Sequence, residues 1–189
     1  MTAQRLVVVD TETTGFGKHD RVVEVAAVTL DARTLAVVDE FETLIDPEGS
    51  VGPTSVHGIT EAMVAGAPTF AEVAAALTDH LDGSVLVAHN LKFDRRMLDQ
   101  EYERFTPRDD LDWGAGICTL RLSGMKLAVA CETHGIPLLG HHRALDDARA
   151  TAELLRRVVD RDAETSPMAL RLPAGLPSST PRTRLHADA

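Results

Sequence analysis

Three short acidic motifs, in a fixed order along the chain, constrain this sequence more than any other feature. They read Asp10-Thr11-Glu12-Thr13-Thr14-Gly15, His89-Asn90-Leu91-Lys92-Phe93-Asp94 and His142-Arg143-Ala144-Leu145-Asp146-Asp147. Each motif places a carboxylate at the end of an apolar strand or on the inner side of a helix. A carboxylate in such a place is costly unless it is paired or binds a metal ion.

The first motif ends an apolar run over residues 6–9, which is typical of a central strand buried on both faces. Side chains alternate between the two faces of a strand, so Asp10 and Glu12 are predicted to share one face and Thr11 to take the other. Two carboxylates on one face can hold a divalent ion, and oxygen ligands select hard cations such as Mg²⁺ or Mn²⁺. A solvated strand end is the simpler alternative for this motif taken alone.

The second motif follows an apolar run over residues 84–88, and its last residues open a predicted helix. Asp94 shares a helix face with Met97, Leu98, Glu101 and Phe105. Asp94 is therefore predicted to lean toward the apolar side. Helix capping is the common alternative role for an aspartate near a first turn.

Helix geometry separates the two aspartates of the third motif. At about 100° per residue, Asp147 clusters with Ala144, Thr151, Leu154 and Val158, whereas Asp146 clusters with Arg149, Ala150, Glu153 and Arg157. Asp147 is expected to face the core as the catalytic acid, and Asp146 to face water beside the arginines. His142 lies in the preceding loop, from which it could reach bound metal ions, and His141 is its competitor. Four inward carboxylates and one histidine point to a two-metal site that cuts phosphodiester bonds.

The remaining pattern predicts a mixed α/β sheet covered by helices. The expected strands are residues 6–9, 22–30, 36–45, 84–88 and 117–119, with a hairpin turn over 31–34, and the expected helices are 70–81, one starting near 93, 126–134 and 144–159. After about residue 161 the chain becomes rich in Pro, Ser, Thr and Ala. We therefore expect one domain over residues 1–161 and a disordered tail over 162–189.

Composition limits the partners and the compartment. The net charge is −10, which argues against a long electrostatic grip on a duplex, because phosphate binding normally comes from Lys and Arg. A short contact at a strand end, or affinity supplied by a partner, fits better. The two cysteines, Cys118 and Cys131, make no disulfide framework and fit a reducing cytoplasm. The apolar stretch at the start is too short for a signal peptide or a membrane span, so no membrane association is expected.

Together the three motifs resemble the DEDDh family of 3′-5′ exonucleases, whose branches include the epsilon subunit of DNA polymerase III and RNase T. The resemblance spans about residues 5 to 160, and the five-residue step from His142 to Asp147 selects His142 over His141. It implies a ribonuclease H-like fold, with a mixed five-stranded sheet flanked by helices. It also implies release of nucleoside monophosphates from a 3′ end, with a DNA substrate and a role in proofreading or repair if the chain follows the epsilon-like branch. The low content of basic residues favours single-stranded or frayed 3′ ends.

The resemblance assigns roles to particular residues. The catalytic set is Asp10, Glu12, Asp94, His142 and Asp147, in which the four carboxylates hold two divalent ions, Mg²⁺ or Mn²⁺, and His142 is the general base. The residues implied to contact the substrate are Thr13, Gly15, Phe16, His57, Ile59 and Asn90. A stretch over residues 164–170 faintly resembles a sliding-clamp-binding segment, so a DNA polymerase or a sliding clamp is a candidate partner alongside the single-stranded 3′ end, while an idle tail is the simpler alternative for this stretch.

Three alternatives stay open. The first is an RNA-trimming exoribonuclease of the same family. DNA and RNA are distinguished by contacts to the 2′-hydroxyl, and no residue in the sequence decides between them. The second is an inactive scaffold or polymerase-associated binding subunit. This hypothesis predicts that at least one catalytic group is missing, and none is. A phosphatase of the haloacid dehalogenase type wants a second aspartate where this chain has Glu12, and a later lysine that has no convincing candidate.

Overall fold

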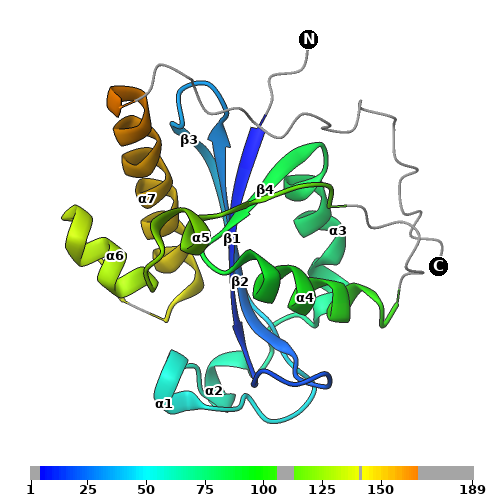
Figure 1. The fold of residues 1–189 in the computed structure, drawn as a ribbon. Helices are drawn as coiled ribbons and strands as arrows, with labels where there is room; N and C mark the ends of the chain where they lie inside the picture. The colour runs from blue at the N-terminus through cyan, green and yellow to red at the C-terminus, as the bar shows by residue number, and fades with distance from the viewer. Residues whose placement is uncertain (1–4, 106–112, 141, 166–189) are drawn as a thin grey trace.

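A computed structural model describes residues 5–105, 113–140 and 142–165 of the 189-residue chain. Its centre is a five-stranded sheet in the order β3-β2-β1-β4-β5 (Figure 1). The strands are β1 (Arg5–Thr13), β2 (Val22–Asp31), β3 (Val37–Leu44), β4 (Ser84–Ala88) and β5 (Ile117–Cys118). The first three strands pair antiparallel, while β4 joins β1 and β5 in parallel. The expected mixed sheet is therefore confirmed.

Helices cover both faces of the sheet. They are α1 (Thr54–His57), α2 (Glu61–Val64), α3 (Phe70–Leu81), α4 (Leu91–Tyr102), α5 (Thr119–Ser123), α6 (Leu127–His134) and α7 (Ala144–Thr165). Figure 1 shows α7 on one side of the sheet and α3 with α4 on the other. None of the helices that the structure describes is both long and apolar enough to cross a membrane.

Side-chain alternation along β1 creates two separate cores. Val7 and Val9 pack with α3 and α4, whereas Leu6 and Val8 pack with α7. Helix α7 meets the sheet through a stripe of small residues, Ala144, Ala148 and Ala152, that recurs once per turn. Small side chains let the helix axis approach the sheet closely, which brings the polar residues of its first turn next to the end of β1.

The structure departs from the expected elements mainly at ends and in short pieces. Strand β1 continues through the first motif to Thr13, and α7 continues to Thr165, past residue 161 where the tail was expected to begin. The single-turn helices α1, α2 and α5 were not predicted, because four or five residues carry too little periodicity to be recognised. The expected tail beyond residue 165, with most of the clamp-like segment, lies outside the described residues.

Candidate active site

The acidic end of β1 extends beyond its parallel neighbour. The pairing of β1 with β4 ends at Val8 opposite Val87, whereas its pairing with β2 continues to Thr13. The side chains of Asp10 and Glu12 continue the face that Leu6 and Val8 present to α7, as the alternation predicted. Beyond the end of this pairing, the first turns of α4 and α7 lie next to β1, and they carry the other two predicted acids, Asp94 and Asp147.

Asp94 reaches the site from α4 on the opposite face of β1. Its side chain is buried, and the Thr11 hydroxyl donates a hydrogen bond to its Oδ1 atom over 3.0 Å. Thr11 thus takes the face opposite Asp10 and Glu12, as expected. The inward direction predicted for Asp94 from helix periodicity is also confirmed.

The third motif meets the first on the α7 side. One potential ligand atom each from Glu12, His142 and Asp147 lies within 4.8 Å of the others. The backbone N–H of His142 also donates to Asp147 Oδ2 over 3.2 Å. Asp147 is 5% exposed, whereas the side chain of Asp146 is 36% exposed and lies 3.8 Å from Arg149. The helix-face argument therefore gave the correct orientation for both aspartates, while His141 lies outside the described residues.

Burial raises the pKa values of Asp10, Glu12 and Asp94, and repulsion between carboxylates adds to the shift at Asp10 and Glu12. Burial, followed by the charges of Asp94, Asp147, Glu12 and Glu24, raises the pKa of Asp10 well above its usual range. Burial, followed by the same kind of repulsion, raises the pKa of Glu12 to about 8, against a lowering effect of Arg143. Burial raises the pKa of Asp94 to about 7 although the hydrogen bond from Thr11 opposes the shift. The site therefore favours a neutralising partner for its carboxylates.

The donor set fits a hard divalent cation. It offers oxygen atoms from four carboxylates and a ring nitrogen from one imidazole. No basic side chain is among the largest influences on the pKa values of Asp10 and Asp94. Arg143 does act on Glu12, but its guanidinium already binds Glu24. Carboxylate oxygens without a basic counter-charge are the ligands that Mg²⁺ and Mn²⁺ prefer. Asp10, Glu12, Asp94 and Asp147 are the residues that could hold such ions.

These pKa shifts predict how the stability of the metal-free protein depends on pH. Glu12 ionises near 4.5 in an unfolded chain and near 8 in the fold, so the folded state holds more protons between these values. The free energy of unfolding should therefore be highest below about pH 4.5–5 for this group, and should fall as the pH rises toward about 8, by an amount on the order of 2–4 kcal/mol.

Urea denaturation in EDTA at about pH 5.5 and pH 8 measures this loss, and Mg²⁺ or Mn²⁺ should restore stability more at the higher pH. The variant Glu12→Gln should flatten the pH dependence, while Glu40→Gln, at a glutamate on the outer strand β3, should not. A metal-free stability that rises steadily from pH 5.5 to 8 would show that the carboxyls are not repelling one another.

Two buried glutamates support the site, and neither was predicted. Glu24 lies opposite Glu12 in the pairing of β2 with β1 and is 0% exposed. It accepts hydrogen bonds from the Arg143 side chain and from the backbone N–H of Ala144. The signal was present in the sequence, because a glutamate within an otherwise apolar strand must find a partner if the strand is buried.

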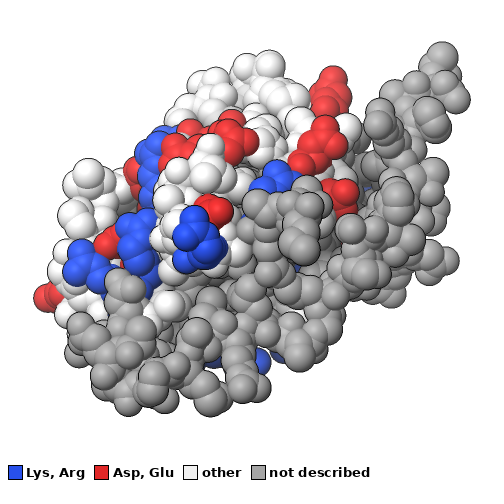
Figure 2. Space-filling view, turned by 90° about the horizontal axis from the view of Figure 1, so that it is seen from above, with Lys and Arg blue, Asp and Glu red and all other residues white. Residues whose placement is uncertain are grey.

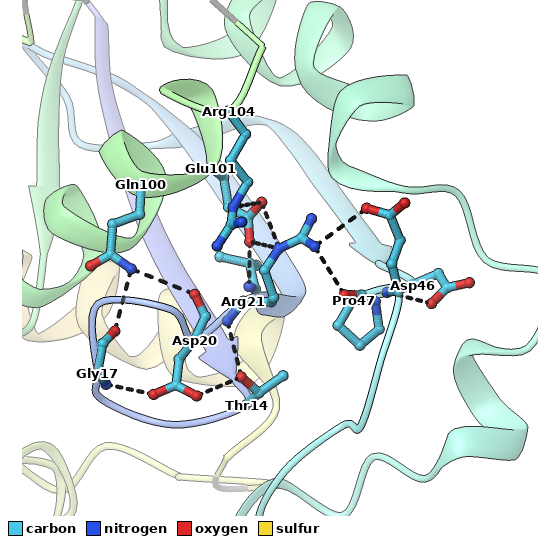
Figure 3. A network of polar contacts seen from close by, with 11 residues as sticks. Thr14, Gly17, Asp20, Arg21, Asp46, Pro47, Gln100, Glu101 and Arg104 are labelled. Atoms are coloured by element: carbon cyan, nitrogen blue, oxygen red, sulfur yellow. Dashed lines mark hydrogen bonds and ion pairs between the residues drawn. The ribbon is translucent and has the colours of Figure 1, made fainter.

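Glu101 plays the matching part on the α4 side (Figure 3). It is 1% exposed and accepts hydrogen bonds from Arg21 Nε, at 2.9 and 3.1 Å, and from the backbone N–H of Val22. Arg21 also donates to the carbonyl of Pro47, and the neighbouring loop is closed by Asp20, which binds Thr14 and Gly17. This network ties the β1–β2 turn to the helix that carries Asp94.

The residues implied to contact the substrate differ in how far they are exposed to solvent. Phe16 is 76% exposed on the β1–β2 turn, and Asn90 is exposed just before α4. In contrast, His57 and Ile59 are buried, joined by a hydrogen bond from the Ile59 N–H to His57 Nδ1. The side chain of Ile59 packs in a small core with Val23, Val51 and Val64. The remaining two, Thr13 and Gly15, are joined by a hydrogen bond from the Thr13 hydroxyl to the Gly15 carbonyl.

Comparison with known proteins agrees with this geometry. The RNase_T family model, described as Exonuclease, matches residues 7–155. The chain is 39% identical over 158 residues to DNA polymerase III PolC-type from Clostridium perfringens, covering 79% of this chain and 11% of that protein. It is 36% identical over 168 residues to a DNA polymerase III subunit epsilon-like protein from Rhodobacter capsulatus, covering 81% and 23%. The chain thus spans between about a tenth and a quarter of these relatives.

Solved structures show the same fold. Exonuclease X in complex with 5′ overhanging duplex DNA superposes with a TM-score of 0.62 at 31% identity, covering 86% of this chain and 93% of that one. E. coli exonuclease I in complex with a dT13 oligonucleotide gives a TM-score of 0.71 at 18% identity, covering 86% and 42%. The matched segment contains all three acidic motifs, so this chain belongs to the family of DEDD-type exonucleases, as the motifs predicted.

Proposed function

We propose that this protein is a metal-dependent 3′-5′ exonuclease that removes nucleoside monophosphates from single-stranded or frayed DNA 3′ ends. The observation that carries the proposal is the convergence of Asp10, Glu12, Asp94 and Asp147 with His142 at the end of β1. The match to the exonuclease family supports a nuclease. Membership of both PolC-type and epsilon-like proteins among the relatives favours DNA over RNA.

Each group has a defined task in this proposal. When bound by the four carboxylates, divalent ions supply charge stabilisation for the attacking and leaving oxygens. His142 takes a proton from the attacking water, whose oxygen forms a bond to the terminal phosphorus. The bond from phosphorus to the 3′-oxygen of the preceding nucleotide breaks, and that oxygen receives a proton. The products are a nucleoside monophosphate and a strand one nucleotide shorter.

The exposed ring of Phe16, beside the partly buried ring of Phe93, supports a single-stranded substrate. The ring of Phe16 meets that of Phe93 edge-on at 5.7 Å, and the guanidinium of Arg96 lies 5.4 Å from the Phe93 ring centre. Stacking on aromatic rings is a common way to bind unpaired bases without reading their sequence. In this proposal Phe16 stacks on the terminal base, which has to leave a duplex to reach it.

The charge distribution also favours a short contact. The net charge is −10; Figure 2 shows the end of the molecule away from the acidic end of β1, where acidic side chains are interspersed with basic ones. A long duplex track needs a stripe of Lys and Arg. The protein is therefore proposed to hold only a few nucleotides, and a DNA polymerase or a sliding clamp is proposed as the partner that supplies further affinity.

A degradation assay on matched substrates tests the proposal. Single-stranded DNA, a mismatched primer-template, a blunt duplex and single-stranded RNA would each carry a 3′ or a 5′ label, with Mg²⁺ or EDTA. We expect a 3′ label to appear at once as mononucleotide, and a 5′ label to remain on a ladder of shortened strands. Blunt duplex should react slowly, because unpairing costs a few kcal/mol.

The controls separate the remaining readings. Asp147→Ala, purified in the same way, detects contaminating nucleases. RNA degraded faster than DNA would favour the RNA-trimming alternative, and cleavage of circular single-stranded DNA would contradict an exonuclease. No activity on any substrate with either metal would favour a binding subunit.

A further inference from the structure

The loop that carries His142 is held by an ion pair between Arg143, which is partly exposed, and the buried Glu24. Glu24 is fully buried in β2 and uses both carboxylate oxygens. Its Oε1 accepts from Arg143 Nη2 at 2.6 Å and from Arg143 Nε at 3.1 Å, and its Oε2 accepts from the backbone N–H of Ala144 at 2.9 Å. Both partners directly follow His142 in the chain, so one side chain fixes the two residues after the histidine.

The backbone at His142 needs such support. His142 has a φ of 70°, in the left-handed region that residues other than glycine seldom adopt. Backbone in this region persists only where the surroundings fix it. Here the Asp147 carboxylate accepts from the His142 N–H, and Glu24 holds the next two residues. The conformation directs His142 to the cluster with Glu12 and Asp147.

We propose that Glu24 and Arg143 are positioning residues, which act on catalysis by holding His142 and the first turn of α7 against the end of β1 and not by touching the substrate. This inference deepens the proposed exonuclease function and rests on it. Neither residue has to touch the substrate. Loss of the pair should therefore lower turnover and leave substrate binding nearly unchanged.

A second ion pair, made by α7 itself, provides a matched control. Arg149 of α7 binds Glu40 of β3 through the same two nitrogens, Nε and Nη2, at 2.9 and 2.6 Å. One pair joins the sheet to the residue before α7 and the other joins it to α7, but Glu40 is partly exposed and lies on the outer strand. If an Arg–Glu link from α7 to the sheet were needed only for stability, the two pairs should behave alike.

The kinetic test compares Arg143→Met, Arg143→Lys and Arg149→Met in the full chain. Arg143→Met leaves the charge of Glu24 buried without its ion-pair partner, which destabilises the fold, so the double variant Glu24→Gln/Arg143→Met, which removes both charges, is included. We expect kcat on single-stranded DNA to fall about 10–100-fold in the double variant, with KM changed less than about threefold. Arg143→Lys should recover part of the loss, and Arg149→Met should match the wild type.

A spectroscopic test does not depend on activity. In the full chain labelled with ¹⁵N-histidine, the signals of His142 are identified by their loss in His142→Ala. They should shift or broaden in the Glu24 and Arg143 variants and stay in place in Arg149→Met. If the wild type degrades no nucleic acid, the proposed function fails, yet this measurement still decides whether the pair holds His142.

Three results would overturn the positioning role. Equal effects of Arg143→Met and Arg149→Met would reduce the pair to general stability. A rise in KM at constant kcat would make Arg143 a substrate ligand. Unchanged His142 signals in the double variant would show that the loop keeps its conformation without the pair.

Discussion

Replacing Asp147 by alanine is expected to lower exonuclease activity by about 10³-fold or more while the fold is kept. Charge stabilisation at a metal-assisted site contributes several kcal/mol, and each 1.4 kcal/mol is about tenfold in rate. Asp147 is buried beside Glu12 and repels both Glu12 and Asp10. Its removal should therefore leave the metal-free protein as stable as before, or more stable.

Asp146→Ala is the matched control, because the two aspartates are neighbours with opposite directions. Asp146 is partly exposed and faces Arg149 over 3.8 Å, and such surface pairs contribute little. Its loss should change activity by less than about twofold. Initial rates on labelled single-stranded DNA, with circular dichroism to verify folding, would measure both variants. A dead Asp146→Ala beside an active Asp147→Ala would show that the wrong face of α7 was assigned to the site.

The directions of these side chains could be predicted because periodicity controls them. The alternation along β1 separates Asp10 and Glu12 from Thr11, and the 3.6-residue period of α7 separates Asp147 from Asp146. Both rules hold wherever an element has one apolar face, so a single sequence is enough. The mixed five-stranded sheet and its flanking helices followed from the same patterns and from the resemblance to known exonucleases.

The supporting residues could not be predicted because their partners are far away in the sequence. Glu24 and Arg143 are 119 residues apart, and Arg21 and Glu101 are 80 apart. Sequence reasoning can notice that Glu24 interrupts an apolar strand, but only the folded arrangement shows which arginine reaches it. Both pairs anchor a helix to the beginning of β2, one at the C-terminal end of the helix that carries Asp94 and one at the start of the helix that carries Asp147.

The burial of His57 and Ile59 shows a different limit. A motif from related proteins assigns a segment to the substrate but does not say which atoms make contact. Here the Ile59 side chain fills a small core, and His57 binds the Ile59 backbone. The exposed residues of the same turn are Thr54, Ser55 and Val56, with Val56 at 46%. A contact from this segment to a nucleotide would therefore have to use groups other than the Ile59 side chain.

His142→Ala is expected to lower kcat by roughly 10²–10⁴-fold, the usual scale for losing a general base. His142 has access to solvent, while Glu12 and Asp147 beside it are buried, as a group that handles the attacking water requires. The acid side of the pH–rate profile, measured with saturating metal so that the carboxylates stay ionised, should depend on this imidazole in the wild type. That dependence should be lost in the variant. His134→Ala, at the end of α6, is the control and should leave kcat unchanged.

The proximity of His142 to Glu12 and Asp147 allows a second role, and metal binding distinguishes the two. One ring nitrogen lies within 4.8 Å of a carboxylate oxygen from each neighbour, so the imidazole could hold a metal ion instead of a proton. A general base contributes to turnover alone, so Mn²⁺ affinity in His142→Ala should stay within about threefold of the wild type while kcat falls. If Mn²⁺ affinity falls by the same factor as kcat, and raising the Mn²⁺ concentration restores the rate, His142 is a ligand. The proton from the attacking water would then have to pass to solvent or to one of the carboxylates whose pKa the site has raised.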